Sequence, residues 1–96
     1  MRKSKTEPID QLIQSYIRGM GLERPLSENR LILSWESVTG KYIAGQTRKI
    51  YIRNRVLYVQ IQSPLVKREL NLIKEGLLKR LNEPFEQPVI DDIQIF

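Results

Sequence analysis

The sequence predicts an α+β fold in which helices cover one face of a three-stranded sheet. Three stretches carry apolar residues at helical spacing, and three shorter segments have the composition and alternation of strands. Their order along the chain is helix, helix, strand, strand, helix, strand. Helices packed on one side of such a sheet form two layers and leave its other side open. A chain of 96 residues suits one domain, which we expect at residues 7–96 after a flexible N-terminus at residues 1–6.

The three helices are delimited by capping and breaking residues. We expect the first at about residues 6–21, the second at about residues 26–39 and the third at residues 64–81. Gly40 ends the second helix, and Ser63 is a natural N-cap for the third. The apolar stripe of the third helix is expected to consist of Val66, Leu70, Ile73, Leu77 and Leu81, widened by Leu65 and Leu72.

Residues 47–53 and 56–62 alternate as the two strands of a hairpin, and residues 89–96 favour a closing strand. Asn54 tolerates the left-handed backbone that hairpin turns need. Because Arg55 rather than glycine follows it, we expect a loop slightly longer than two residues. One face of the hairpin carries Ile50, Ile52, Leu57, Val59 and Ile61. The other face carries Lys49, Tyr51, Arg53, Tyr58, Gln60 and Gln62.

Composition excludes several kinds of chemistry. The chain has no cysteine and no histidine, so it builds no disulfide, no Ser-His-Asp or Cys-His triad and no ordinary zinc site. Gly40 and Gly45 have the spacing of a phosphate-binding loop, but the lysine and hydroxyl residue that must follow are missing. Asp91 and Asp92 are neighbours in a strand and point to opposite faces, which makes them a poor metal pair. We therefore expect no enzymatic activity, no metal and no cofactor.

Positive charge is concentrated in the middle of the chain. The net charge is +5, yet residues 41–80 alone hold ten cations against two anions, and residues 81–96 hold four anions and no cation. Localised positive charge on a small domain is typical of a protein that binds polyanions. The alternative is that these charges serve solubility alone.

The polar face of the hairpin is the main candidate for a binding site, because cations and phenol rings suit phosphates and bases, or an acidic protein surface. Tyr51 and Tyr58 either stack on bases or form a cross-strand pair that stiffens the sheet. Trp35 lies on an apolar helical stripe and is expected to anchor the core. The expected nucleic-acid-binding residues are Arg48, Lys49, Tyr51, Arg53, Arg55, Tyr58, Lys67 and Arg68.

No segment of the sequence suggests a membrane. A spanning helix needs about 18 or more consecutive apolar residues, and the chain has no such run. The basic residues at the N-terminus are not followed by the apolar stretch of a signal peptide. We expect a cytoplasmic protein with no membrane partner.

An ordered set of residues between Trp35 and Leu81 resembles a known family. The set comprises Trp35-Glu36-Ser37-Val38-Thr39-Gly40, Ile43-Ala44, Thr47, Leu57-Tyr58-Val59, Ser63 and Lys67-Arg68-Glu69-Leu70. It is similar to the DciA-like family of bacterial proteins, long catalogued as a domain of unknown function. The resemblance implies a KH-like fold and a non-enzymatic role in loading or regulating the replicative helicase. It also implies contacts with that helicase and with single- or double-stranded DNA.

Two other functions remain open, a pure protein-interaction module and a KH-like RNA-binding protein. KH domains clamp the nucleic-acid backbone with a Gly-x-x-Gly loop, and no pair of glycines in this chain has that spacing. Many members of the resembled family carry a long C-terminal tail that grips the helicase. Because this chain ends at Phe96, we expect that its helicase contacts either use the folded surface or do not form in the same way.

Overall fold

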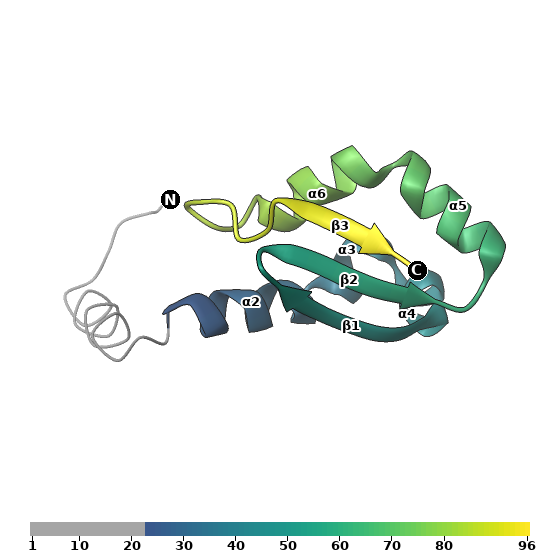
Figure 1. The fold of residues 1–96 in the computed structure, drawn as a ribbon, viewed down its shortest axis with the longest axis horizontal. Helices are drawn as coiled ribbons and strands as arrows, with labels where there is room; N and C mark the ends of the chain where they lie inside the picture. Colours follow the sequence, from purple (N-terminus) through teal and green to yellow (C-terminus); the bar gives the residue numbers. More distant parts are fainter. Residues whose placement is uncertain (1–22) are drawn as a thin grey trace.

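Helices and strands follow one another in the predicted order along residues 23–96, the part of the chain that the computed structural model describes (Figure 1). The first predicted helix, at about residues 6–21, lies outside the described residues. The helices are α2 (Glu23–Leu33), α3 (Trp35–Thr39), α4 (Lys41–Gln46), α5 (Pro64–Leu72) and α6 (Lys74–Asn82). The strands are β1 (Thr47–Arg53), β2 (Val56–Ile61) and β3 (Asp92–Ile95). The predicted two-layer α+β fold is confirmed.

The sheet is mixed, with β2 in the centre. β2 pairs antiparallel with β1 and parallel with β3. A parallel neighbour needs a long crossover, which α5, α6 and the connector before β3 supply. The described helices lie on one side of the sheet, and no described element covers its other side (Figure 1).

The hairpin between β1 and β2 turns in two residues. The register pairs Arg53 with Val56, and the turn residues have positive φ angles of 53° for Asn54 and 65° for Arg55. These angles are those of a type I′ turn. The expectation of a longer loop is therefore wrong. A left-handed backbone costs a non-glycine residue about 1–2 kcal/mol. The side chain of Arg55 makes contacts, described below, that hold the turn in this conformation.

A break at Ser34 divides the predicted second helix into α2 and α3, and α2 begins at Glu23, earlier than predicted. The amide of Ser34 lies 3.1 Å from the carbonyls of both Arg30 and Leu31, and its hydroxyl donates to the Leu31 carbonyl at 2.7 Å. Such local bonds of serine compete with the regular helical ladder. Gly40 ends α3 as predicted, with a φ of 97°.

A second break, at Ile73, divides the predicted third helix into α5 and α6. Ile73 has φ −107° and ψ 16°, and its amide lies 3.3 Å from the Glu69 carbonyl and 3.2 Å from the Leu70 carbonyl. Leu65 and Leu72 are seven residues apart and lie on the side of α5 that faces away from the core. Of the predicted stripe, Val66, Leu70, Leu77 and Leu81 are buried, whereas Leu65, Leu72 and Ile73 are exposed. The prediction that those last three belong to one apolar stripe with the buried residues is therefore wrong.

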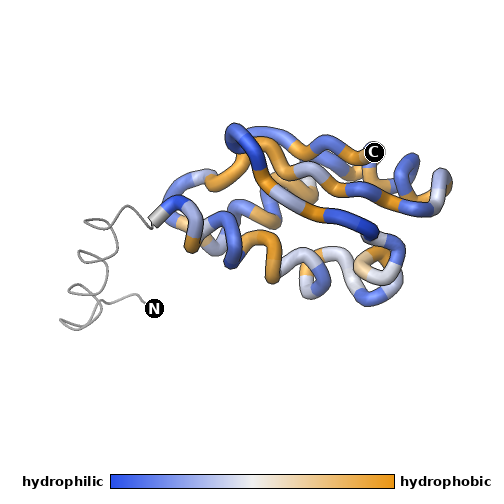
Figure 2. Tube along the Cα trace, turned by 60° about the horizontal axis from the view of Figure 1, so that its bottom comes forward, coloured by the Kyte–Doolittle hydropathy of each residue, from blue (hydrophilic) through white to orange (hydrophobic). Residues whose placement is uncertain are grey.

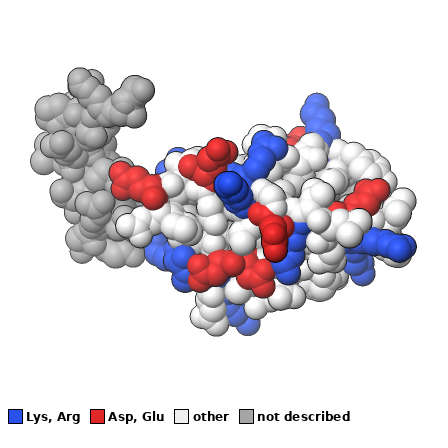
Figure 3. Space-filling model, turned by 90° about the horizontal axis from the view of Figure 1, so that it is seen from above, with Lys and Arg blue, Asp and Glu red and all other residues white. Residues whose placement is uncertain are grey.

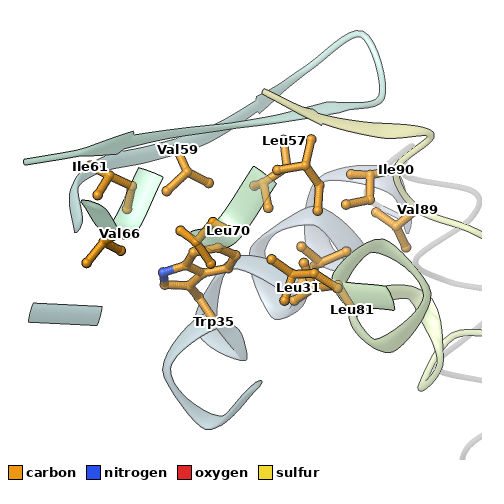
Figure 4. Close-up of a cluster of buried hydrophobic side chains, with 12 residues drawn as sticks. Leu31, Trp35, Leu57, Val59, Ile61, Val66, Leu70, Leu81, Val89 and Ile90 are labelled. Carbon is orange, nitrogen blue, oxygen red and sulfur yellow. The ribbon is translucent and has the colours of Figure 1, made fainter. Parts of the chain in front are cut away.

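The core fills the space between the sheet and the helices (Figure 4). Trp35 is 4% exposed, and its indole Nε1 donates to Thr47 Oγ1 at 3.0 Å. That hydroxyl donates in turn to the carbonyl of Ile43 at 2.8 Å. Trp35 is therefore a core anchor, as predicted, and it ties α3 to the start of β1. The buried apolar residues are Leu31, Trp35, Leu57, Val59, Ile61, Val66, Leu70, Leu77, Leu81, Val89, Ile90 and Ile93.

Asn82, at the end of α6, fixes the connector that leads to β3. Its Oδ1 accepts from the amides of Val89 at 2.8 Å and Ile90 at 3.1 Å, and its Nδ2 donates to the Ile90 carbonyl at 2.9 Å. Arg24 of α2 donates to the Val89 carbonyl. These bonds hold Val89 and Ile90 in the core and set the position from which β3 starts.

Candidate nucleic-acid interface

The register of the hairpin decides which side chains face away from the helices. Ile50 lies opposite Val59 and Ile52 opposite Leu57, and all four contribute to the core or pack against it. Since side chains alternate along a strand, the pairs between them face the other way. We call this surface the outer sheet face; it is formed by Lys49, Tyr51, Arg53, Val56, Tyr58 and Gln60.

A β-bulge places Arg48 outside the core. Thr47 pairs with Ile61 and Lys49 pairs with Gln60, so the register shifts by one residue between them. Strict alternation would put Arg48 on the same side as Ile50, in the core. The extra residue of the bulge removes this conflict, since Thr47 faces the indole of the core while Arg48 and Lys49 are both exposed.

Tyr51 and Tyr58 form a cross-strand stack at the centre of the outer sheet face. They are directly opposite in the register, their ring centres are 5.1 Å apart, and the ring planes are inclined by 16°. Both residues are partly buried. The guanidinium carbon of Arg53 lies 6.0 Å from the Tyr51 ring centre, at the outer limit of a cation–π contact. The cross-strand pair that the sequence left as one alternative is thus present.

The free cations of the hairpin lie at the two ends of β1, so that this strand is strongly hydrophilic at both ends and more apolar between them (Figure 2). Arg48 and Lys49 are exposed at one end and Arg53 is exposed at the other. Within residues 23–96, none of the three has an acidic side chain within ion-pair distance. Their positive charges are therefore available to attract a negatively charged ligand that approaches the hairpin.

Among the predicted site residues, Arg55 is the one that forms an ion pair within residues 23–96. Its Nε and one terminal nitrogen donate to the two carboxylate oxygens of Asp91 at 2.8 and 2.9 Å, and the same terminal nitrogen donates to the Pro88 carbonyl at 2.9 Å. The hydrogen bond to Asp91 raises the pKa of Arg55, and the reciprocal bond lowers the pKa of Asp91. The pair ties the hairpin turn to the connector before β3.

Lys67 and Arg68 lie on α5, in the helical layer, and not on the outer sheet face. Val66 and Leu70 of that helix face the core. At about 100° per residue, Arg68 points almost directly away from the core, while Lys67 points sideways and is partly buried. The eight predicted residues therefore fall into two groups, six on the hairpin and two on α5.

A second pairing that the sequence does not predict joins Asp92 to Lys74, with 3.3 Å between Oδ1 and Nζ. The pKa of Asp92 is lowered chiefly by the backbone amide of Ile93 and further by Lys74. No local sequence signal relates residues so far apart along the chain. Over α6 and the connector, acidic side chains are interspersed with basic ones, and this view shows no continuous cationic patch (Figure 3).

The described residues hold no candidate metal site. Residues 23–96 contain no group of three or more acidic side chains arranged to hold a metal ion. None of the helices in this part of the chain is both long enough and apolar enough to cross a membrane.

Comparison with known proteins identifies the family. A search of curated proteins finds no match. The family model described as "Dna[CI] antecedent, DciA" matches residues 8–95. This match extends well beyond the segment from Trp35 to Leu81 that carried the resemblance in the sequence. The match therefore confirms the predicted resemblance. The chain belongs to the DciA family.

Proposed function

We propose that the protein is a non-enzymatic adaptor that helps load or regulate the replicative helicase and contacts DNA through its outer sheet face. Membership of the DciA family supports a helicase-loader-like role in general and the replicative helicase as the kind of partner. The family is one of loaders or adaptors and not of enzymes. The observation that carries the DNA contact is the stacked pair of Tyr51 and Tyr58 with exposed cations at both ends of the neighbouring strand.

In this proposal the cations of the outer sheet face contact phosphates, and its tyrosines contact a base. Lys49 and Arg53 are four residues apart on β1, or about 13 Å along a strand, and each contacts a different phosphate. Arg48 adds a cation beside Lys49. The rings of Tyr51 and Tyr58 lie between them and offer an aromatic surface to a base. Nothing in this arrangement reads base identity, so binding is indifferent to sequence.

The remaining predicted residues contribute less to this surface. Arg55 already shares its charge with Asp91, so its attraction for phosphate is weakened. Lys67 and Arg68 reach DNA only if the DNA strand passes around the end of the sheet at which α5 begins. We therefore rank the hairpin cations Arg48, Lys49 and Arg53 above these three.

Titration of fluorescent single- and double-stranded DNA with the intact protein tests the DNA contact. We expect micromolar or weaker binding at low salt, in the range of about 10⁻⁴–10⁻⁶ M for non-specific contacts. The double substitution Lys49→Gln and Arg53→Gln should weaken binding and make the salt dependence shallower. For a single strand, the log–log slope should decrease by about 0.7 for each lost phosphate contact.

The matched control for this titration is Lys79→Gln with Arg80→Gln, which removes the same charge from the exposed surface of α6. No binding by the unmodified protein, or an equal loss in the α6 control, contradicts the outer sheet face as the DNA contact. A parallel titration with single-stranded RNA shows whether the surface distinguishes the two nucleic acids.

The exposed cations of the outer sheet face equally suit an acidic surface of a protein partner, which is the second candidate function. Charge reversal by Lys49→Glu with Arg53→Glu separates the two. If recovery of the helicase is lost while DNA affinity is unchanged, the face serves the protein and not DNA. Affinity purification from native cells, with and without nuclease, tests the partner itself, since helicase recovered after nuclease treatment is bound without DNA.

A further inference from the structure

β1 is an edge strand of the described sheet. Within residues 23–96 it pairs with β2 alone. In a two-residue hairpin the pair that flanks the turn, here Arg53 and Val56, exchanges both backbone hydrogen bonds, and every second pair beyond it does the same. The amides and carbonyls of Ile50 and Ile52 therefore point away from β2, toward the open edge.

The same two isoleucines are incompletely covered. Their partners across the sheet, Val59 and Leu57, are both 0% exposed. Ile50 and Ile52 face the same core but remain partly exposed. The difference follows from their position, because β2 has a strand on each side and β1 has one. A further strand beside β1 would satisfy the free backbone groups and cover the exposed apolar surface in one step.

Charge argues against a second copy of this strand as the occupant. β1 holds Arg48, Lys49 and Arg53 and no acidic residue. Two copies paired along this edge would bring six cations together, and charged residues on an edge strand are a known means of preventing such self-association. The edge favours a segment of opposite charge, because like charges opposite one another on neighbouring strands are destabilising.

We infer that the edge of β1 that has no strand partner within residues 23–96 accepts an extended acidic segment of a partner protein as a fourth strand. Apolar side chains of that segment lie beside Ile50 and Ile52, and its carboxylates lie beside Lys49 and Arg53. Strand addition of this kind takes its affinity from the main chain and its specificity from alternate side chains. It goes beyond the proposed DNA contact, since it uses the backbone of Ile50 and Ile52 and needs no nucleic acid.

The probe is a short blocked peptide in which valine and glutamate alternate, added to the isotope-labelled full chain without DNA. Hydrogen exchange followed by NMR should show slower exchange at the amides of Ile50 and Ile52. The amide of Tyr51 already bonds to β2 and should not change. A peptide of the same composition with its valines and glutamates in separate blocks is the control, and it should leave Ile50 and Ile52 unprotected.

Two further sets of peptides test the geometry and the charge. N-methylation of one alternate set of amides should abolish binding, while methylation of the other set should leave it intact. Loss with both sets, or with neither, overturns strand addition. A peptide of alternating valine and lysine that binds equally well overturns the acidic partner. Protection of Ile50 and Ile52 that rises with protein concentration alone would instead assign the edge to a second copy of the chain.

Discussion

Arg55 and Asp91 form a bidentate ion pair, in which Arg55 donates hydrogen bonds of 2.8 Å from Nε and 2.9 Å from a terminal nitrogen to the carboxylate. Arg55 is also a turn residue with a left-handed backbone. The same side chain therefore imposes strain on the hairpin turn and joins that turn to the connector before β3. The pairing has consequences for pH dependence and for the effect of changing the turn.

The substitution Asp91→Asn should lower the melting temperature at neutral pH and have little effect in strong acid. The pKa of Asp91 is lowered in the folded protein by the hydrogen bond from Arg55. A lowered carboxyl pKa stabilises the fold at pH values above the unfolded pKa of about 3.9, and this contribution disappears as the pH falls through the folded value. Melting curves of both proteins between neutral and acidic pH measure the difference. A gap that stays constant across this range contradicts the ion pair, and Glu86→Gln, at an exposed site, is the control.

The effect of Arg55→Gly should depend on whether Asp91 is present. Asn-Gly is the preferred pair for a type I′ turn, so glycine removes a backbone cost of about 1–2 kcal/mol. In the presence of Asp91 the substitution also removes the bidentate pair, so the gain should be smaller or absent. In an Asp91→Asn background only the relief of strain remains, and the protein should become more stable. Urea unfolding of the two single variants and the double variant gives the coupling between the residues. Additive effects would show that the pair contributes nothing.

Asn82→Ala should destabilise the fold by about 1–3 kcal/mol, because it leaves buried backbone groups of the connector without partners. Val89 and Ile90 lose their amide acceptor, and the Ile90 carbonyl loses a donor. Urea unfolding followed by far-ultraviolet circular dichroism measures the change. Asn71→Ala is the matched control, since within residues 23–96 that exposed amide bonds to Lys67 of its own helix and to no other residue. Equal losses in the two variants would rule out a special role for Asn82.

Leu70→Ala and Leu72→Ala test which side of α5 faces the core. Leu70 is 0% exposed and Leu72 is 79% exposed, although the two are close neighbours on α5. The first substitution should cost about 2–5 kcal/mol of unfolding free energy through the cavity that it leaves. The second should stay within about 0.5 kcal/mol, as is usual for the surface. Chemical unfolding of both proteins provides the measurement, and a large loss in Leu72→Ala would mean that this side of α5 is covered.

The outer sheet face could be predicted because it depends on local rules. The alternation of Ile50, Tyr51 and Ile52 fixes which side chains share a face once the core side is known. The position of Trp35 in an apolar stripe likewise predicted its burial. At these positions the apolar residues that the sequence pattern places on one face are the residues that pack in the core.

The departures from prediction arise where tertiary contacts override a local pattern. Ile73 fits a continuous helical stripe, and only the packing of two helical segments against one sheet exposes it. Arg55 and Asp91 are 36 positions apart, so nothing near either residue signals the other. The bulge at Arg48 allows Thr47 to face the core and accept a hydrogen bond from the indole of Trp35. That contact becomes apparent only when the helices are in place.

Because Trp35 donates a hydrogen bond to Thr47, its fluorescence can be used to follow the contact between the helical layer and the sheet. The chain has one tryptophan, and its ring lies where α3 meets the first residue of β1. Its fluorescence therefore reports whether the helical layer is packed against the sheet. No other indole contributes to the signal. A ligand on the far side of the sheet should leave the wavelength of maximum emission unchanged. Separation of the layers should shift it toward the red.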